Sequence, residues 1–488
     1  MRSLLANLVQ LGGMQVVIAG TALVRNKVLA ARLGADGFGV YAQLTLLALA
    51  AAVVVAFGLG MSLNRNVAAT PDRAGRQRLL AQANGVVLAL TALVALALPG
   101  LLLWPDALRT FGLEPTPAVV AALLILGAFV PLEAAVQHRV AFLTGALDVK
   151  GMTSGRSLAL AIGTAVSLPL VWWFGLLGAA LQLTLMTLLI AAFLDRRLRR
   201  LGYRPWAIAF DRPTLRLLAG FGVASLLAGF GQRAADVVVR SALITTVDAA
   251  QNGIYQAATA ITYQVKAVVL GSVGSYAIAT LAQDASRAAV QAAAGRLLSV
   301  VLPIAAVALA GLGLLSGPAI LVLYAPSFLE AQAVLPYLLV AEFVQVPVWV
   351  LGAPLLAMDR VRVWLAFEIG ASVVRAVLAL ALLPTLGVVG VAVAAAATSA
   401  VQLLATGAFF VGVLRLQVAA RDVALLAGGL VVVAGAAALG AGAVFELWRV
   451  AVGVVAIAAF AAVALHAVVG WSAAWGHARA AWARRSAA

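Results

Sequence analysis

Six basic residues lie inside long apolar segments, where an unpaired charge costs at least about 2.5–3.5 kcal/mol. They are Arg25, Lys27, Arg65, Arg233, Lys266 and Arg375. Charged side chains at such depth normally face a water-filled cavity or a partner of opposite charge. Arginine matches phosphate oxygens with two parallel hydrogen bonds. The set therefore predicts a site for an anionic, phosphate-bearing headgroup.

Polar residues follow one face of the apolar segment 250–281. They are spaced by four, three, four and three residues, namely Asn252, Gln256, Thr259, Tyr263 and Lys266. Residues at this spacing share one side of a helix, so the pattern predicts a polar wall facing an aqueous cavity. The alternative is hydrogen bonding between helices that serves packing only.

The segment 215–241 carries a second group of charges, in which Asp236 lies three residues after Arg233 and four before Arg240. Asp236 can pair with either arginine on its own helix. One arginine is left over in both cases, and we expect it to be available to an anion. The alternative is a purely structural ion pair.

Arg25 and Arg65 have two readings each. Arg25 either binds phosphate or extends to the outer headgroups, and Arg65 either binds phosphate or anchors the inner interface. Lys27 is expected at the interface.

The acids inside apolar segments are few. Glu368 lies two turns from Arg375, so we expect these two to pair. Glu133 and Glu342 have no obvious partner in the sequence, and the alternative is that they meet arginines or His138. They are candidates for ion coupling if transport is driven by protons.

The composition defines the elements that must position these residues. The chain has 488 residues, of which 64% are hydrophobic and 10% charged, and its mean hydropathy is +1.09. A soluble domain is about 45–50% apolar, so a soluble protein is excluded. The chain has no cysteine and three scattered histidines, so we expect neither a metal site nor a cofactor.

Apolar stretches of membrane-spanning length recur along the whole chain. They predict about fourteen helices: 4–31, 38–62, 79–104, 116–142, 153–174, 176–195, 215–241, 250–281, 292–315, 331–357, 361–383, 386–413, 422–444 and 448–470. Turn residues such as Gly34 to Gly37 and Pro384 to Gly387 separate them. We expect the first segment to be retained as a helix rather than cleaved as a signal peptide.

A net charge of +16 is common in proteins that bind nucleic acid, but the distribution of the basic residues here indicates membrane topology. With both termini in the cytoplasm, alternate loops place 23 basic residues inside, Arg139 among them, and 4 outside. This bias is what the positive-inside rule predicts for a multi-pass membrane protein. The sequence contains no basic stretch with stacking aromatic residues of the kind that binds nucleic acid, so nucleic-acid binding is not expected.

The chain also contains an internal duplication. Gly39-Val40-Tyr41 returns as Gly253-Ile254-Tyr255 at an offset of 214, and Gly175 to Ala179 returns as Gly387 to Val391 at 212. Ala146-Leu147-Asp148 returns as Ala357-Met358-Asp359 at 211. We therefore predict two parallel six-helix bundles around a central cavity. Their bounds are 1–200 and 201–415, followed by an additional helix pair, 416–470, and a cytoplasmic tail, 471–488.

Several segments resemble polysaccharide-exporter flippases of the Wzx type. They are Ala31 to Tyr41, Phe57-Gly58-Leu59, Asn64 to Ala68, Gly175 to Ala179 and Leu323 to Phe328. The resemblance covers about residues 1–414 and implies the multidrug/oligosaccharidyl-lipid/polysaccharide exporter (MOP) superfamily, with a MATE-like all-α fold. It implies translocation of an undecaprenyl-diphosphate-linked oligosaccharide to the outer leaflet, for O-antigen, capsule or exopolysaccharide synthesis. The partners implied are this glycan lipid, membrane lipids, polymerase or export machinery, and H⁺ or Na⁺ as coupling ion.

Three alternatives stay open at the level of sequence. The spacing from Arg25 to Gly34 also resembles the lipid II flippase branch, without that branch's fuller set of basic residues. A multidrug cation antiporter of the same fold would need more intramembrane acids. A membrane polymerase or ligase would need a larger outer loop, so we expect no enzyme activity.

Overall fold

The computed structural model describes residues 2–281, 287–358, 360–441 and 446–469. Within these ranges the chain forms helices and no strands, as its apolar composition requires in a bilayer. The helices are α1 (Arg2–Ala56), α2 (Leu59–Ala69), α3 (Arg73–Leu103), α4 (Pro105–Thr110), α5 (Pro117–Gly145), α6 (Val149–Arg200), α7 (Arg212–Thr246), α8 (Ala249–Leu281), α9 (Arg287–Leu314), α10 (Ser316–Leu323), η1 (Pro326–Phe328), α11 (Ala331–Ala357), α12 (Val361–Ala408), η2 (Phe409–Val413), α13 (Ala420–Gly440) and α14 (Leu447–Val469). The predicted all-α membrane fold is confirmed.

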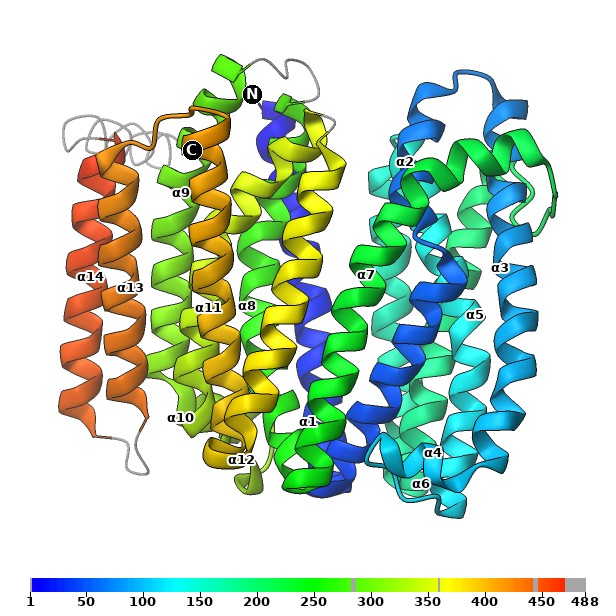
Figure 1. The fold of residues 1–488 in the computed structure, drawn as a ribbon, viewed down its shortest axis with the longest axis horizontal. Coiled ribbons are helices and arrows are strands. Elements are labelled where there is room, and N and C mark those ends of the chain that lie inside the picture. The colour runs from blue at the N-terminus through cyan, green and yellow to red at the C-terminus, as the bar shows by residue number, and fades with distance from the viewer. Residues whose placement is uncertain (1, 282–286, 359, 442–445, 470–488) are drawn as a thin grey trace, which may run out of the picture. The chain divides into compact units, whose positions relative to one another are not determined.

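Ten helices of the described chain are long and apolar enough to cross a membrane. Three helices contain one glycine with a non-helical, left-handed backbone, at Gly34 in α1, Gly175 in α6 and Gly387 in α12. A straight helix of 55 residues, the length of α1, would measure about 80 Å, far more than the bilayer. Figure 1 shows α1 reversing direction, so it supplies two of the predicted segments.

The breaks expected near Gly34, Gly175 and Gly387 are present. Each is a single glycine with a non-helical backbone that separates two helical segments, and glycine tolerates such a backbone cheaply. The expected helix 38–62 is interrupted where Phe57 and Gly58 take φ of 52° and 61°. A Cβ at Gly58 would overlap the Gly222 carbonyl oxygen of α7, so this interruption allows α7 to approach closely.

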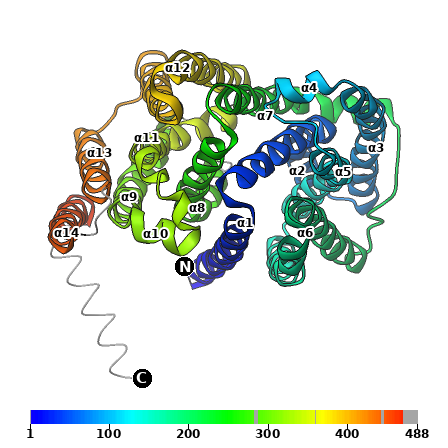
Figure 2. The ribbon, with the colours of Figure 1, turned by 90° about the horizontal axis from the view of Figure 1, so that it is seen from below.

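The chain divides into two compact units. Unit 1 comprises Met1–Ala257, Val322–Phe328 and Val361–Val391, and unit 2 comprises Ala258–Leu321, Leu329–Arg360 and Ala392–Ala488. In unit 1, α5 packs against α6 and against α1 (Figure 2). In unit 2, α9 packs against α11 and α13, and α14 covers α13 (Figure 2). The predicted repeat boundaries at 200 and 415 do not follow these units and stay a prediction, and the tail 471–488 lies outside the described residues.

One contact within unit 1 supports the internal duplication. A Cβ at Gly39 would overlap the carbonyl oxygen of Ala249, and a Cβ at Gly253 would overlap that of Ala35. Both pairs of equivalent residues are 214 apart, which is the offset of the repeated Gly-x-Tyr motif. The two motifs therefore pack against each other reciprocally, and glycine is needed because each backbone meets the other without space for a side chain.

Candidate anion-binding site

One charged residue of α7, Asp236, contacts the first half of α12. The Asp236 carboxylate accepts an ion pair from Arg375 at 2.8 Å (Oδ1 to Nη1), and Arg375 also donates to the Gln232 carbonyl at 3.3 Å. The expected pairing of Arg375 with Glu368 is therefore wrong. Asp236 is bound across helices rather than by either arginine of its own helix, because it lies on the side of α7 that meets α12.

We call Arg233, Asp236, Arg240 and Arg375 the α7 cluster. Arg240 is 9% exposed, and its guanidinium lies 5.3 Å from the centroid of the Tyr255 ring. Its Nε is buried and has no hydrogen-bond partner in the described chain. Arg233 is half-buried and lies within electrostatic range of Arg240, as does Arg375.

The α7 cluster is cationic overall, with three arginines and one aspartate. Its one carboxylate already forms the ion pair with Arg375, so the positive charge of Arg240 is opposed only at longer range. A buried cation in this position repels its basic neighbours. An anion bound there would relieve the repulsion and supply an acceptor for Nε.

Arg25 of α1 is a second cation without a carboxylate partner in the described chain. Its Nη1 lies 3.5 Å from the sulfur of Met186 on α6, which is a weak acceptor. Its Nε is buried without a hydrogen-bond partner, and the guanidinium lies within electrostatic range of Tyr41 and Tyr324. Arg25 and Arg240 share this condition, and both belong to unit 1.

Tyr324, directly after α10, is bound by the part of α1 that precedes Gly34. Asn26 donates to its hydroxyl at 3.1 Å, and Lys27 donates to its carbonyl. Phe38 and Phe328 pack around the ring, with centroids 5.9 and 5.3 Å away. Burial raises the pKa of Tyr324, which keeps it a neutral phenol. Lys27 is therefore bound to backbone, and the role of Tyr324 was missed although its motif stands out in the sequence.

The polar stripe of α8 changes in exposure along its length. Asn252 is fully buried and donates to the Gly39 carbonyl at 2.8 Å, whereas Tyr263 is 59% exposed. Gln256 and Thr259, between them, are half-buried. The first residue of the stripe, Asn252, is therefore buried by packing, whereas Tyr263 near its end is exposed. In this conformation only the second part of the stripe can line an aqueous space.

The last residue of the stripe is compensated by an acid. Lys266 forms an ion pair with Glu342 of α11 at 2.5 Å, and both belong to unit 2. Glu342 therefore has its basic partner on another helix, and that partner is a lysine. Glu133 accepts a hydrogen bond from Gln137 at 3.2 Å, while His138 bonds to the Ala56 carbonyl at 2.9 Å instead.

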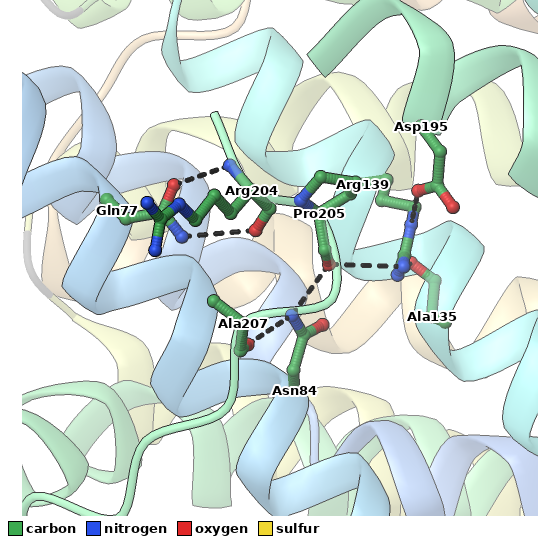
Figure 3. Close-up of polar contacts among 8 residues, drawn as sticks. All are labelled: Gln77, Asn84, Ala135, Arg139, Asp195, Arg204, Pro205 and Ala207. Carbon is green, nitrogen blue, oxygen red and sulfur yellow. Dashed lines mark hydrogen bonds and ion pairs between the residues drawn. The ribbon is translucent and has the colours of Figure 1, made fainter. Parts of the chain in front are cut away.

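Arg139 presents the opposite case to Arg240. It is fully buried and forms an ion pair with Asp195 of α6, which is 5% exposed (Figure 3). It also donates to the carbonyls of Ala135 at 3.1 Å and Pro205 at 3.3 Å, and it lies 4.4 Å from the Trp206 ring centroid. The sequence placed Arg139 with the inner loops. The structure shows that Arg139 lies within α5, which continues to Gly145, and that its side chain is buried.

The segment 201–211, which joins α6 to α7, is held by the same group of contacts. Asn84 of α3 donates to the carbonyls of Pro205 at 2.8 Å and Ala207 at 2.9 Å (Figure 3). Gln77 accepts from the Arg204 amide at 2.8 Å and donates to its carbonyl at 3.1 Å. Arg139 therefore has a structural role, because its charge and its donors are satisfied by the protein itself.

The other candidate residues add little to the site. Arg65 is exposed at the end of α2. Among the described residues, no group of three histidine, aspartate or glutamate side chains could hold a metal ion.

Comparisons with known proteins agree with this architecture. Residues 4–218 match the family of polysaccharide biosynthesis proteins, and among curated proteins none matches the sequence. Solved structures give a lipid II flippase, MurJ, in an inward closed conformation, with a TM-score of 0.75 and 12% identity over 94% of this chain and 99% of that one.

A MATE family multidrug resistance transporter of the MOP superfamily, in its inward-facing conformation, gives a TM-score of 0.68. It is 16% identical over 82% of this chain and 96% of that one. MATE in a straight conformation gives 0.59, with 16% identity over 84% and 96%. The chain thus matches the polysaccharide biosynthesis family in its first 218 residues, and its fold is the one shared by MATE transporters and MurJ.

Proposed function

We propose that the chain is a flippase that moves an undecaprenyl-diphosphate-linked oligosaccharide from the inner to the outer leaflet of the bacterial inner membrane. The family match concerns polysaccharide biosynthesis, and one of the similar structures is a flippase for a lipid-linked sugar. Transport would proceed by alternating access, which the MATE-like fold supports, and both termini would lie in the cytoplasm. The translocated glycan would serve O-antigen, capsule or exopolysaccharide synthesis.

One observation carries the proposal: Arg240 is a nine-tenths-buried guanidinium whose nearby acid is already paired with Arg375. A diphosphate carries about two negative charges and would otherwise leave its hydration shell at high cost. Arg25, Arg233 and Arg240 supply fixed donors and charge for it, and no covalent step is needed. Arg65, which also belongs to unit 1, would act at the entrance.

Lys266 is a further candidate for contact with the headgroup, and in the structure it is paired with Glu342. Its ammonium is available to an anionic headgroup only when the pair with Glu342 opens, and Glu342 is the first candidate for ion coupling. Glu133 is the second candidate for coupling to H⁺ or Na⁺.

Reconstitution of the full chain in vesicles tests the function. The assay measures the fraction of fluorescent undecaprenyl-diphosphate-linked oligosaccharide that becomes accessible to a membrane-impermeant reductant from the opposite side. We expect rapid translocation of this lipid, and none of a zwitterionic phospholipid with the same label. Equal translocation of both lipids would contradict the proposal.

The same vesicles distinguish the alternatives. Preference for lipid II over lipid-linked oligosaccharides would make the chain a peptidoglycan-precursor flippase, for which the MurJ fold is the supporting observation. Efflux of cationic dyes would indicate a MATE-type antiporter. The latter is disfavoured because Asp236 and Glu342 are both paired with basic residues.

A further inference from the structure

Unit 2 contains an apolar cavity of about 460 Å³ that the proposed transport does not use. It is lined by α9, α11, α12, η2 and α13, through residues such as Leu298, Leu351, Leu404, Phe410 and Leu426. Its volume lies in the range of small-molecule sites, and its walls lack the polar groups that would hold a polar ligand along its length. The cavity is suited to a flexible hydrocarbon chain.

One end of the cavity is built from irregular backbone. The π-helix η2 follows α12, and Arg415 directly after it has φ of 50°, a left-handed conformation that is costly for arginine. This turn places Leu416, which is 7% exposed, in the cavity wall and leaves Arg415 outside. Strained backbone of this kind gathers at ligand sites.

Basic side chains gather at the same end. Arg296, Arg415 and Arg421 are exposed, and each is adjacent in sequence to a lining residue, namely Gly295, Leu416 and Asp422. Asp422 is the one acid among the lining residues, is 5% exposed and pairs with Arg421 at 3.4 Å. Among the described residues, three arginines and one aspartate give this rim a formal excess of positive charge, and the sequence topology assigns it to the cytoplasmic side.

We propose that the cavity binds an anionic phospholipid, with one acyl chain inside it and the headgroup phosphate at the arginine rim. An apolar slot in membrane-spanning helices with a basic rim has the two features that such a lipid needs. A phosphatidylcholine headgroup would gain less, because its choline carries a positive charge. The bound lipid would brace α13 against α12. This site is independent of the proposed function.

Native mass spectrometry and thermal unfolding of the delipidated full chain in detergent test the proposal. We expect phosphatidylglycerol to bind at least tenfold more tightly than phosphatidylcholine with the same acyl chains, and to raise the unfolding temperature by several degrees. Equal binding of the two lipids would overturn the proposal.

A cavity-filling variant locates the site. A Cβ at Gly407, which lines the cavity, would meet no atom within 4 Å, so Gly407→Leu fills the slot without a backbone clash. We expect at least tenfold weaker phosphatidylglycerol binding and an unchanged unfolding temperature without lipid. The matched control is Gly435→Leu on α13, which has equally open surroundings and does not line the cavity. Binding by Gly407→Leu at the strength of the control would overturn the proposal.

A charge variant tests the rim. Arg296→Gln combined with Arg415→Gln retains Arg421, so Asp422 keeps its partner. We expect the preference for phosphatidylglycerol over phosphatidylcholine to fall at least tenfold. An unchanged preference would overturn the proposal, and so would displacement of phosphatidylglycerol by undecaprenyl phosphate at lower concentration, which would assign the slot to the substrate tail.

Discussion

Arg139 and Arg240 are both at least nine-tenths buried in membrane-spanning helices, yet their surroundings differ completely. Arg139 contacts a carboxylate, two carbonyls and an indole ring. Arg240 lies over one phenol ring, has no hydrogen bond at Nε within the described chain, and its nearby acid pairs with Arg375. The protein therefore satisfies one cation fully and leaves the other in need of an acceptor.

This difference shows that depth in the membrane does not by itself identify a functional charge. A buried cation whose donors are all satisfied has no capacity left for a ligand. A buried cation whose neighbours are mostly basic is unfavourable for folding, and such a cost is typical of binding sites. The two arginines should accordingly respond to mutation in opposite ways.

The largest effect is expected at Arg139. Arg139→Ala leaves Asp195 buried without its partner, and loss of one member of a buried pair costs about 3–5 kcal/mol. Unfolding in mixed micelles with increasing denaturant measures this loss. The control is Arg65→Gln, because Arg65 is exposed. We expect its free energy of unfolding to change by no more than about 0.5 kcal/mol. Equal stability of the two variants would contradict the structural role assigned to Arg139.

Arg240→Gln should give the opposite result. We expect its folding stability to be unchanged or higher, because an uncompensated charge is removed, and its translocation rate to fall at least tenfold, or about 1.4 kcal/mol. The vesicle assay and the same denaturation series measure both quantities. A variant that loses stability as Arg139→Ala does while retaining transport would reverse the assignment of the two residues.

Lys266 should be intermediate, because Glu342 compensates it. We expect Lys266→Met to lower the affinity for a lipid diphosphate no more than about threefold, which is about 0.7 kcal/mol. Glu342→Gln should raise the affinity by releasing the ammonium. Binding titrations with undecaprenyl diphosphate check both variants. A loss of affinity in Lys266→Met as large as that in Arg240→Gln would show that the ion pair with Glu342 does not keep Lys266 from the ligand.

The smallest effect is expected at Asp211, where the segment held by Arg139 enters α7. Asp211 caps this helix, and its hydrogen bonds from the Thr214 hydroxyl and amide hold its pKa below the usual value. The stabilisation is present above the unfolded-state pKa of about 3.9 and is lost as the pH falls through the lower folded-state pKa. Thermal unfolding of wild type and Asp211→Asn between pH 7 and pH 3 should therefore converge at the acid end. A constant difference across this range would contradict the capping role.

The sequence predicted the helices well because membrane spans are recognised by hydrophobic length alone. The breaks expected near Gly34 and Gly387 are present as single non-helical glycines between two helical segments. The prediction failed where a break depends on a tertiary contact. The segment 38–62 contains Gly58, whose close contact with Gly222 of α7 cannot be seen from local composition.

The candidate site was predicted in residue type but not in pairing. The i+3 and i+4 rule suggested partners on the same helix for Asp236, whereas the acid pairs across helices with Arg375. The partners of Arg375 and Glu342 depend on which helices face each other. This is a property of the tertiary structure that the sequence does not reveal. Arg139 was missed because an arginine near a helix end is usually exposed, and no local signal marks Asp195 as its partner.

The most direct test of the central claim is the difference in affinity between undecaprenyl diphosphate and uncharged undecaprenol, measured for wild type and for Arg25→Gln combined with Arg240→Gln. The two lipids share one tail, so their difference isolates recognition of the diphosphate. We predict that wild type prefers the diphosphate at least tenfold and that the double variant does not. An equal preference in both proteins would contradict the claim that these two uncompensated arginines bind the headgroup.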